Sequence, residues 1–168
     1  MPGQVKPIPE GFHTVTPYLT CHDAAKAIDF YKQGFGATEV TRMQTPHGKI
    51  GHAELRIGDS MIMLADEMPG GEVRSPQSLG GTTTALFIYV KDVDSAYEKA
   101  VKAGAKAVMP PQDMFWGDRY GKLTDPFGHS WGLATHKEDV APDEMKRRAE
   151  VEMAKMASGR KTSSAQPV

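Results

Sequence analysis

The chain has very little cysteine and no long apolar run. Its single cysteine, Cys21, excludes an internal disulfide and a zinc cluster built from cysteines, and this usage fits a reducing compartment. No apolar stretch reaches the length of a membrane span, and the N-terminus lacks the charged and apolar regions of a secretory signal. We therefore expect a cytoplasmic protein that does not act at membranes.

Charge of one sign is also scarce. The formal net charge is −1, so we expect no general attraction to nucleic acid or to membrane surfaces. Common catalytic signatures are missing too, because the chain has no nucleophile-elbow serine motif, no P-loop and no dinucleotide-binding glycine motif. With 168 residues, 39% of them hydrophobic, the chain is an ordinary globular one whose partner must be selected by a local site.

What the sequence does contain is an internal repeat. The stretch DAAKAIDFYKQGFGA (23–37) is echoed by DVDSAYEKAVKAGA (92–105), and each copy is preceded by one strand-like run and followed by several more. A duplicated βαβββ unit explains this order. Since a unit so short buries little apolar surface alone, the repeat predicts an α+β fold in which two modules share one curved, mixed, eight-stranded sheet with a cup-shaped cavity.

The repeat and the stretches rich in glycine and proline divide the chain into six segments. They are a flexible N-terminus (1–11), the first module (12–66), a glycine- and proline-rich linker (67–81), the second module (82–136), a C-terminal helix (137–157) and a disordered tail (158–168). Pro142 suits the first turn of the last helix. That helix has a narrow apolar stripe of four residues, Met145, Ala149, Met153 and Met156, which predicts docking against this domain or a symmetry mate, or else a loosely held helix.

The order of elements resembles the vicinal oxygen chelate superfamily, which includes glyoxalase I, extradiol dioxygenases and bleomycin-resistance proteins. The resemblance covers about residues 12–136 and rests on DAAKAIDFYKQGFGA after the first strand and TDPFGHSW before the last. Within it, HAELRIGDSMIMLADEMP (52–69) and FWGDRYGKLTDPFG (115–128) are similar to the PhnB-like branch. Metal-dependent members bind one divalent ion through four side chains, mostly His and Glu, on the first and last strand of each module.

Matching the helix starts and the DPFG turn to that pattern identifies the four corresponding positions. They are Thr16, Met63, Ala85 and Gly132. A thioether, a methyl group and a hydrogen cannot replace carboxylate or imidazole, and a lone hydroxyl is a weak ligand. The resemblance therefore implies that the usual metal site is lost, together with glyoxalase and dioxygenase chemistry, and we expect no cofactor.

Strand alternation offers a different pair of ligands. Across the two-residue turn Gly58-Asp59, His52 and Glu54 should share the inner face with Met63. His52 and Glu54 form either the start of a nonstandard divalent metal site or a metal-free polar pocket in which Glu54 balances a hydrogen-bonded His52. A third ligand would have to come from His129, Asp66 or Glu67.

The segment 115–121 is the second candidate site. Phe115 and Trp116, followed by Asp118 and Arg119 between glycines, suit the mouth of a cavity where a flat ligand stacks and a polar group is oriented. The alternative is structural: Trp116 fills the core, and Asp118 pairs with Arg119 to hold the turn. Trp131 is expected in the core by its parity with Leu133.

We therefore expect a metal-independent small-molecule binding protein of the bleomycin-resistance and glyoxalase-like type, acting as a homodimer. The residues expected to contact the ligand are His52, Glu54, Met63, Phe115, Trp116, Asp118 and Arg119, with Asp66 and Glu67 at the rim. The alternative is a lyase, isomerase or dioxygenase-like enzyme with a nonstandard metal or general base at His52 and Glu54, where Arg119 steadies an enolate. A third hypothesis is an interaction module that works through the C-terminal helix.

Overall fold

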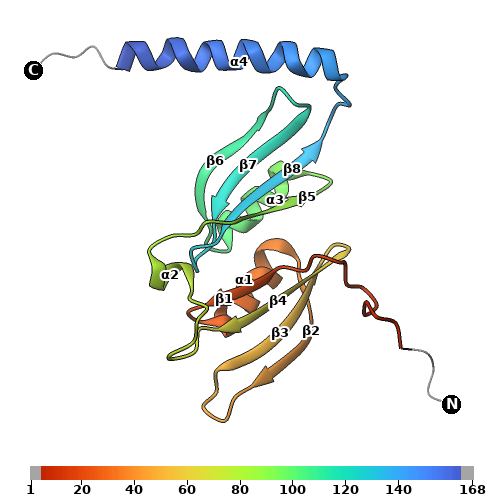
Figure 1. Cartoon of the computed structure of the whole chain (residues 1–168), viewed down its shortest axis with the longest axis vertical. Coiled ribbons are helices and arrows are strands. Elements are labelled where there is room, and N and C mark those ends of the chain that lie inside the picture. Colours follow the sequence, from red (N-terminus) through yellow and green to blue (C-terminus); the bar gives the residue numbers. More distant parts are fainter. Residues whose placement is uncertain (1–4, 164–168) are drawn as a thin grey trace, which may run out of the picture.

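Two copies of the same unit lie one above the other in the computed structural model, which describes residues 5–163 (Figure 1). The first module contains β1 (Tyr18–Cys21), α1 (Ala24–Phe35), β2 (Thr38–Gln44), β3 (Ile50–Ile57) and β4 (Ser60–Asp66). The second contains β5 (Ala85–Tyr89), α3 (Val93–Lys102), β6 (Lys106–Asp113), β7 (Asp118–Thr124) and β8 (Ser130–His136). Helix α2 (Pro76–Leu79) lies in the linker, and α4 (Pro142–Ser163) follows the second module.

An aspartate caps the start of each repeated helix. Asp23 accepts a hydrogen bond from the backbone N–H of Lys26 at 3.1 Å, and Asp92 accepts one from Ser95 at 3.1 Å. These contacts satisfy N–H groups that have no partner inside the helix. Helix α1 ends at Gly36, whose φ of 67° requires the left-handed conformation that glycine adopts without steric cost. The predicted α+β class and the two βαβββ modules are confirmed.

The eight strands form two sheets of four, in the orders β1-β4-β3-β2 and β5-β8-β7-β6. In each sheet the first strand runs parallel to the last, and the other neighbours are antiparallel. Within residues 5–163 no strand pair joins the two sheets, so the single eight-stranded sheet expected from the repeat is divided in this chain. Helices α1 and α3 pack against each other, while β1 and β5 remain edge strands of their own sheets within the described residues.

Helices α1 and α3 contact each other and bury one face of each sheet in a common core. Gly34 of α1 lies close to Ala100 of α3, since a Cβ built on Gly34 would be in van der Waals contact with the Cα of Ala100 at 3.5 Å. Leu55 of the first sheet and Leu133 and Trp131 of the second are fully buried in this core. The predicted core position of Trp131 is confirmed, and Tyr31 and Phe35 of the first module pack against its ring.

Asp125 in the β7–β8 turn ties the two modules together. Its carboxylate accepts hydrogen bonds from the Tyr31 hydroxyl of α1 at 2.7 Å, from the Trp131 indole at 2.9 Å and from the backbone N–H of Phe127 at 2.9 Å. Burial alone would raise the pKa of Asp125, but its contacts with His129, Trp131 and Tyr31 outweigh burial and lower it. This charged group therefore acts as a structural hub of the buried interface.

Helix α4 projects from the second module and crosses one end of the molecule (Figure 1). Arg148 holds its first turns by pairing with Glu138 and Glu144, each at distances of 2.7–2.8 Å. Met153 and Met156 are 66% and 69% exposed, so the end of the apolar stripe is not docked on this domain. Docking on a symmetry mate stays a prediction.

The helix begins at Pro142, which the sequence pattern places in its first turn, but it ends later than the pattern indicates. It runs to Ser163, so residues 158–163 of the expected tail are helical, because each added helical residue gains a backbone hydrogen bond for little further cost. The remaining part of the expected tail, 164–168, and residues 1–4 of the expected flexible N-terminus lie outside the described residues. Between these limits, no helix combines the length and apolar character needed to cross a membrane.

Candidate functional site

Each sheet has one face against its helix and one face without a helix, which we call its open face. In the first sheet, Leu55 and Leu64 are fully buried on the helix side. Because side chains alternate along a strand, His52 and Glu54 of β3 lie on the open face, where Glu54 is directly opposite Met63 of β4. The predicted alternation is confirmed.

Tyr18 of β1 joins His52 and Glu54 on this open face. Its hydroxyl lies 3.0 Å from Nδ1 of His52, and Nε2 of His52 lies 3.3 Å from a carboxylate oxygen of Glu54. An ionised carboxylate can only accept, so Nε2–H donates to Glu54 and leaves Nδ1 to accept from the Tyr18 hydroxyl. This contact crosses β4, which lies between β1 and β3, so local strand alternation alone does not reveal it.

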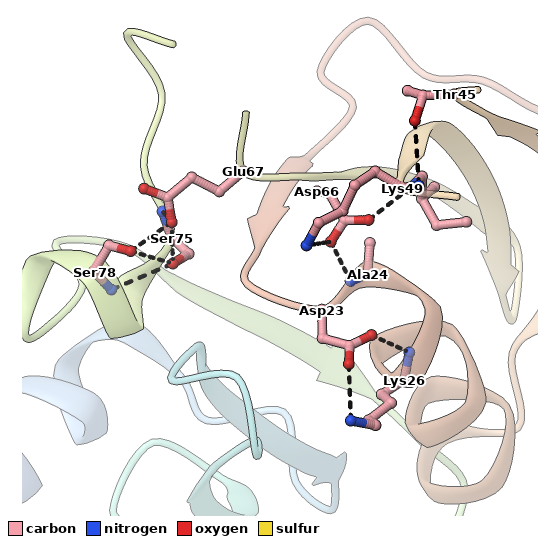
Figure 2. Close-up of polar contacts among 10 residues, drawn as sticks. Asp23, Ala24, Lys26, Thr45, Lys49, Asp66, Glu67, Ser75 and Ser78 are labelled. Carbon is pink, nitrogen blue, oxygen red and sulfur yellow. Dashed lines mark hydrogen bonds and ion pairs between the residues drawn. The ribbon is translucent and has the colours of Figure 1, made fainter. Parts of the chain in front are cut away.

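Asp66, expected at the rim of the cup, instead lies on the helix side of β4. Its carboxylate accepts hydrogen bonds from the backbone N–H of Ala24 at 2.9 Å and of Ile50 at 2.6 Å, and the Lys49 ammonium is 3.9 Å away (Figure 2). The residue is only 6% exposed. Asp66 thus anchors the start of α1 and of β3, and its oxygens do not reach the open face.

Glu67 is also occupied by structural contacts. It accepts hydrogen bonds from the hydroxyls of Ser78 at 2.6 Å and Ser75 at 2.7 Å at the start of α2 (Figure 2), and Arg74 lies 3.2 Å away. The bonds from Ser78 and then Ser75 lower the pKa of Glu67 to about 2. Its role in the structure is to fix the linker to the end of β4.

His129 is the last of the proposed third ligands, and it is buried beside Asp125 at 3.4 Å. None of the three proposed residues therefore joins His52 and Glu54. Over residues 5–163, no group of three His, Cys, Asp or Glu side chains is placed to hold a metal ion. The two ring nitrogens of His52 also face opposite partners, so one ion could not be bound by Tyr18, His52 and Glu54 together in this arrangement.

The four positions that correspond to the family's metal ligands carry no side chain that is suited to bind a metal ion in this structure. The Thr16 hydroxyl donates to the backbone oxygen of His13 at 3.1 Å. Gly132 lies beneath a pair of rings, because a Cβ built there would be 2.7 Å from Tyr120 and 2.8 Å from Phe87. A ligating side chain at this position would therefore collide with the stacked rings. The residues present do not fit the family's usual metal.

The open face of the second sheet carries four aromatic side chains, which we call the aromatic cluster: Phe87, Tyr89, Trp116 and Tyr120. Phe87 and Tyr120 stack with ring centroids 5.3 Å apart and planes 4° apart. Tyr89 lies 5.1 Å from Phe87, and Trp116 lies 6.0 Å from Tyr120. Phe87 and Tyr89 are 47% and 65% exposed, so the cluster presents an apolar aromatic surface to solvent.

Asp118 holds the polar ends of this cluster. Its carboxylate accepts hydrogen bonds from the Tyr89 hydroxyl at 3.0 Å and the Trp116 indole at 3.1 Å, and it lies 2.7 Å from Nδ1 of His136. Hydrogen bonding to Asp118 and then Asp139 raises the pKa of His136. His136 is exposed, and the alternation of β8 through Gly132 places it on the open face.

Arg119 points away from the open face. Its guanidinium pairs with Asp94 of α3 at 2.7 Å and 2.8 Å and with Asp113 at 3.2 Å. The Asp118–Arg119 pair proposed as the structural alternative is wrong, because neighbouring residues of a strand face opposite sides of the sheet. Phe115 precedes β7 and packs edge-to-face on Trp116 at 5.1 Å. Phe115, Trp116 and Asp118 therefore lie together, without Arg119.

A groove separates the free edges of β1 and β5. Its volume is about 1680 Å³, and its walls include Tyr18 and Leu19 on one side and Phe87 and Ile88 on the other. Within the described residues β1 pairs only with β4, and β5 only with β8, so the backbone groups along both walls have no strand partner. The groove thus lies between the two sheet edges.

The fold agrees with comparisons to known proteins. The sequence profile of the glyoxalase/bleomycin resistance protein/dioxygenase superfamily matches residues 11–133. The chain belongs to this superfamily. Among curated relatives, Mb0911c of Mycobacterium bovis is 45% identical over 134 residues, which are 78% of this chain and 88% of that protein.

Solved structures have a similar fold. TioX from Micromonospora sp. ML1 superimposes with a TM-score of 0.58 at 29% identity, covering 74% of this chain and 98% of TioX. A PhnB protein from Bacillus cereus superimposes with a TM-score of 0.57 at 18% identity, covering 73% of this chain and 99% of that protein. The second likeness concerns the fold alone. Membership places the chain among proteins that bind small molecules or act on them.

Proposed function

We propose that the chain is a metal-independent small-molecule binding protein whose ligand lies on the aromatic cluster. The observation that carries this proposal is the exposure of Phe87 and Tyr89, 47% and 65%, next to each other on one open face. Exposed apolar patches on soluble proteins mark binding surfaces when they are contiguous. Trp116 and Tyr120 extend this patch across the sheet.

The geometry of the cluster favours a flat, aromatic ligand. The parallel rings of Phe87 and Tyr120 leave a face on which another ring can stack. Asp118 is 4% exposed and already accepts from Tyr89 and Trp116, so it orients these side chains and does not offer a free charge to the ligand. Stacking and burial, with few ionic contacts, would then supply most of the affinity.

The groove supports a homodimer in which a second copy of the chain completes the cup. Its volume of about 1680 Å³ exceeds that of a typical small-molecule pocket, roughly 300–1,000 Å³. Exposed apolar residues line it, including Val15 at 83% and Leu79 at 63%. Pairing β1 of one copy with β5 of the other would satisfy both free edges and restore the eight-stranded sheet that the repeat predicts. His52, Glu54 and Met63 would then face the partner's cluster.

Calorimetric titration with glycopeptide, quinone and other aromatic compounds tests the binding proposal. We expect at least one class to bind, and Phe87→Ala to weaken that binding by about tenfold through the lost stacking contact. Val40→Ala is the matched control, since Val40 is 50% exposed on β2 of the other module. No binding by any compound, or an equal effect of both substitutions, would overturn the proposal.

The homodimer has a test of its own. Light scattering of the purified protein should give a mass about twice the chain mass of 18.3 kDa.

The second candidate function is catalysis, which the contact of His52 with Glu54 favours. Glu54 or His52 would act as general base, while the predicted enolate role of Arg119 is not supported because its guanidinium is held by Asp94 and Asp113. Metal analysis after reconstitution with zinc, nickel, manganese and iron separates a nonstandard metal site from a metal-free one. A stoichiometric metal that is lost in His52→Ala would favour the enzyme over the binding protein.

A further inference from the structure

The open face of the first sheet carries three hydrogen-bonded polar side chains, Tyr18, His52 and Glu54, which ligand binding on the second sheet does not need. We propose that the Tyr18 hydroxyl is a nucleophile, with His52 as its general base and Glu54 as the positioning residue, and that this site takes an electrophilic acyl or sulfonyl centre. The juxtaposition that carries the proposal is a phenol, an imidazole and a carboxylate in one hydrogen-bonded line. A weak nucleophile hydrogen-bonded to a base that a third group orients is the signature of covalent catalysis.

The distances give each residue a separate role. Tyr18 lies within hydrogen-bond reach of the base, at 3.0 Å from Nδ1, so its proton has an acceptor when the oxygen attacks. Glu54 is 3.3 Å from Nε2, and its carboxylate holds the tautomer in which Nδ1 carries no proton. The imidazole can therefore accept at one nitrogen while the other is held.

The exposed fractions of the three side chains agree with these separate roles. Tyr18 is 51% exposed, whereas the side chains of His52 and Glu54 are 21% and 22% exposed. The attacking group thus meets solvent, and the base and its positioning residue are partly sheltered behind it. Partial shelter strengthens the contacts between them, since solvent screens exposed polar pairs.

Tyr89 provides an internal comparison on the other module. It is more exposed than Tyr18, at 65%, but its hydroxyl donates to the Asp118 carboxylate and not to an imidazole. That hydrogen bond raises the pKa of Tyr89, because it favours the protonated phenol. A carboxylate is also a much weaker base than a neutral imidazole. Tyr89 should therefore be the less reactive of the two exposed tyrosines.

The proposed step balances as a simple substitution. The Tyr18 oxygen forms a bond to the acyl carbon or sulfonyl sulfur, and the bond from that atom to its leaving group breaks. The phenolic proton passes to Nδ1 of His52, and the leaving group departs with the electron pair of its bond. With a sulfonyl fluoride the products are a tyrosyl sulfonate and fluoride, and the imidazolium returns its proton to water.

The test uses the full chain and 4-(2-aminoethyl)benzenesulfonyl fluoride, with the labelling rate of each tyrosine followed by peptide mass spectrometry. We expect Tyr18 to be labelled roughly 100-fold faster than Tyr89, which is the usual size of general-base assistance. His52→Gln should remove this advantage. Glu54→Gln should reduce the rate at Tyr18 by roughly tenfold, because a glutamine amide can donate to Nε2 and favour the wrong tautomer.

The rate at Tyr89 serves as the control for folding in each variant, together with circular dichroism. Tyr18→Phe should abolish the label at this position and leave the Tyr89 rate unchanged. Equal wild-type rates at Tyr18 and Tyr89 would overturn the proposal, as would a Tyr18 rate unaffected by His52→Gln. If His52→Gln does not fold, an unchanged Tyr18 rate in Glu54→Gln would overturn the proposal in its place. These outcomes are independent of ligand binding by the aromatic cluster.

Discussion

The two modules keep the same scaffold but build it with different chemistry. In the first, the backbone N–H of Ala24 at the start of α1 donates to the Asp66 carboxylate of β4 at 2.9 Å. In the second, the equivalent N–H of Val93 donates to the Thr135 hydroxyl of β8 at 2.9 Å. Both contacts satisfy a donor that the helix itself leaves free. The two modules therefore share the same contact geometry, although the acceptor is charged in the first module and neutral in the second.

The open faces of the two modules carry different chemistry. The first carries the polar line of Tyr18, His52 and Glu54, and the second carries the aromatic cluster around Asp118. Buried faces must fill space and pair every polar group, so few substitutions are tolerated there. A face that meets solvent or a ligand has no such requirement. Functional differences between the modules thus accumulate on their open faces.

The largest expected difference between the modules is in the free energy of unfolding when the aspartate in each β-hairpin turn is replaced. Asp125→Ala should destabilise the protein by about 4 kcal/mol, because it leaves the buried Tyr31 hydroxyl and Trp131 indole without an acceptor. Asp59→Ala, in the exposed turn of the first module, should change the free energy of unfolding by less than about 0.5 kcal/mol. Urea unfolding measures both. Similar values for the two variants would contradict the role of Asp125 in joining the modules.

A smaller effect separates the two helix anchors. Asp66→Ala removes a charged acceptor of two backbone N–H groups and should cost about 3 kcal/mol, whereas Thr135→Val should cost about 1 kcal/mol. The free energies of unfolding of both variants, measured at pH 7, give the comparison. Equal losses in the free energy of unfolding would show that the charge of Asp66 contributes no stability beyond that of a neutral acceptor.

The smallest effect is a pH dependence confined to the second module. Asp118 and then Asp139 raise the pKa of His136 above its ordinary 6.5. A raised pKa means that the native state binds the proton more tightly, so this stabilisation is fully present below the unfolded pKa and is lost as pH rises through the folded one. An imidazole titration by NMR should give the raised pKa, and Asp139→Asn should lower it. An unshifted His136 would refute the pairing with Asp118.

Local pattern is sufficient for much of the fold and for part of the site. The helix caps at Asp23 and Asp92 and the alternation of His52, Glu54 and Met63 depend only on near neighbours in the chain. The same alternation places Trp131 in the core. Such features are predictable because a helix or strand presents its side chains with a constant period.

Contacts between distant elements are not predictable in the same way. Asp66 and Glu67 follow one another at the end of β4, yet one anchors α1 and the other fixes α2. The sequence pattern pairs Arg119 with the wrong residue because α3 brings Asp94 to it from another part of the chain. Each of these errors arises where a polar side chain has several possible partners.

Residue order alone established the duplication, the strands and helices, and the presence of poor metal ligands at Met63 and Gly132, since these follow from periodicity and from side-chain chemistry. Packing established that the eight strands divide into two sheets, that Tyr18 reaches His52 across β4, and that four aromatic rings gather around Asp118. The physical reason is that hydrogen bonds and buried surface between remote segments depend on how the helices and sheets pack together, which no local period in the sequence specifies.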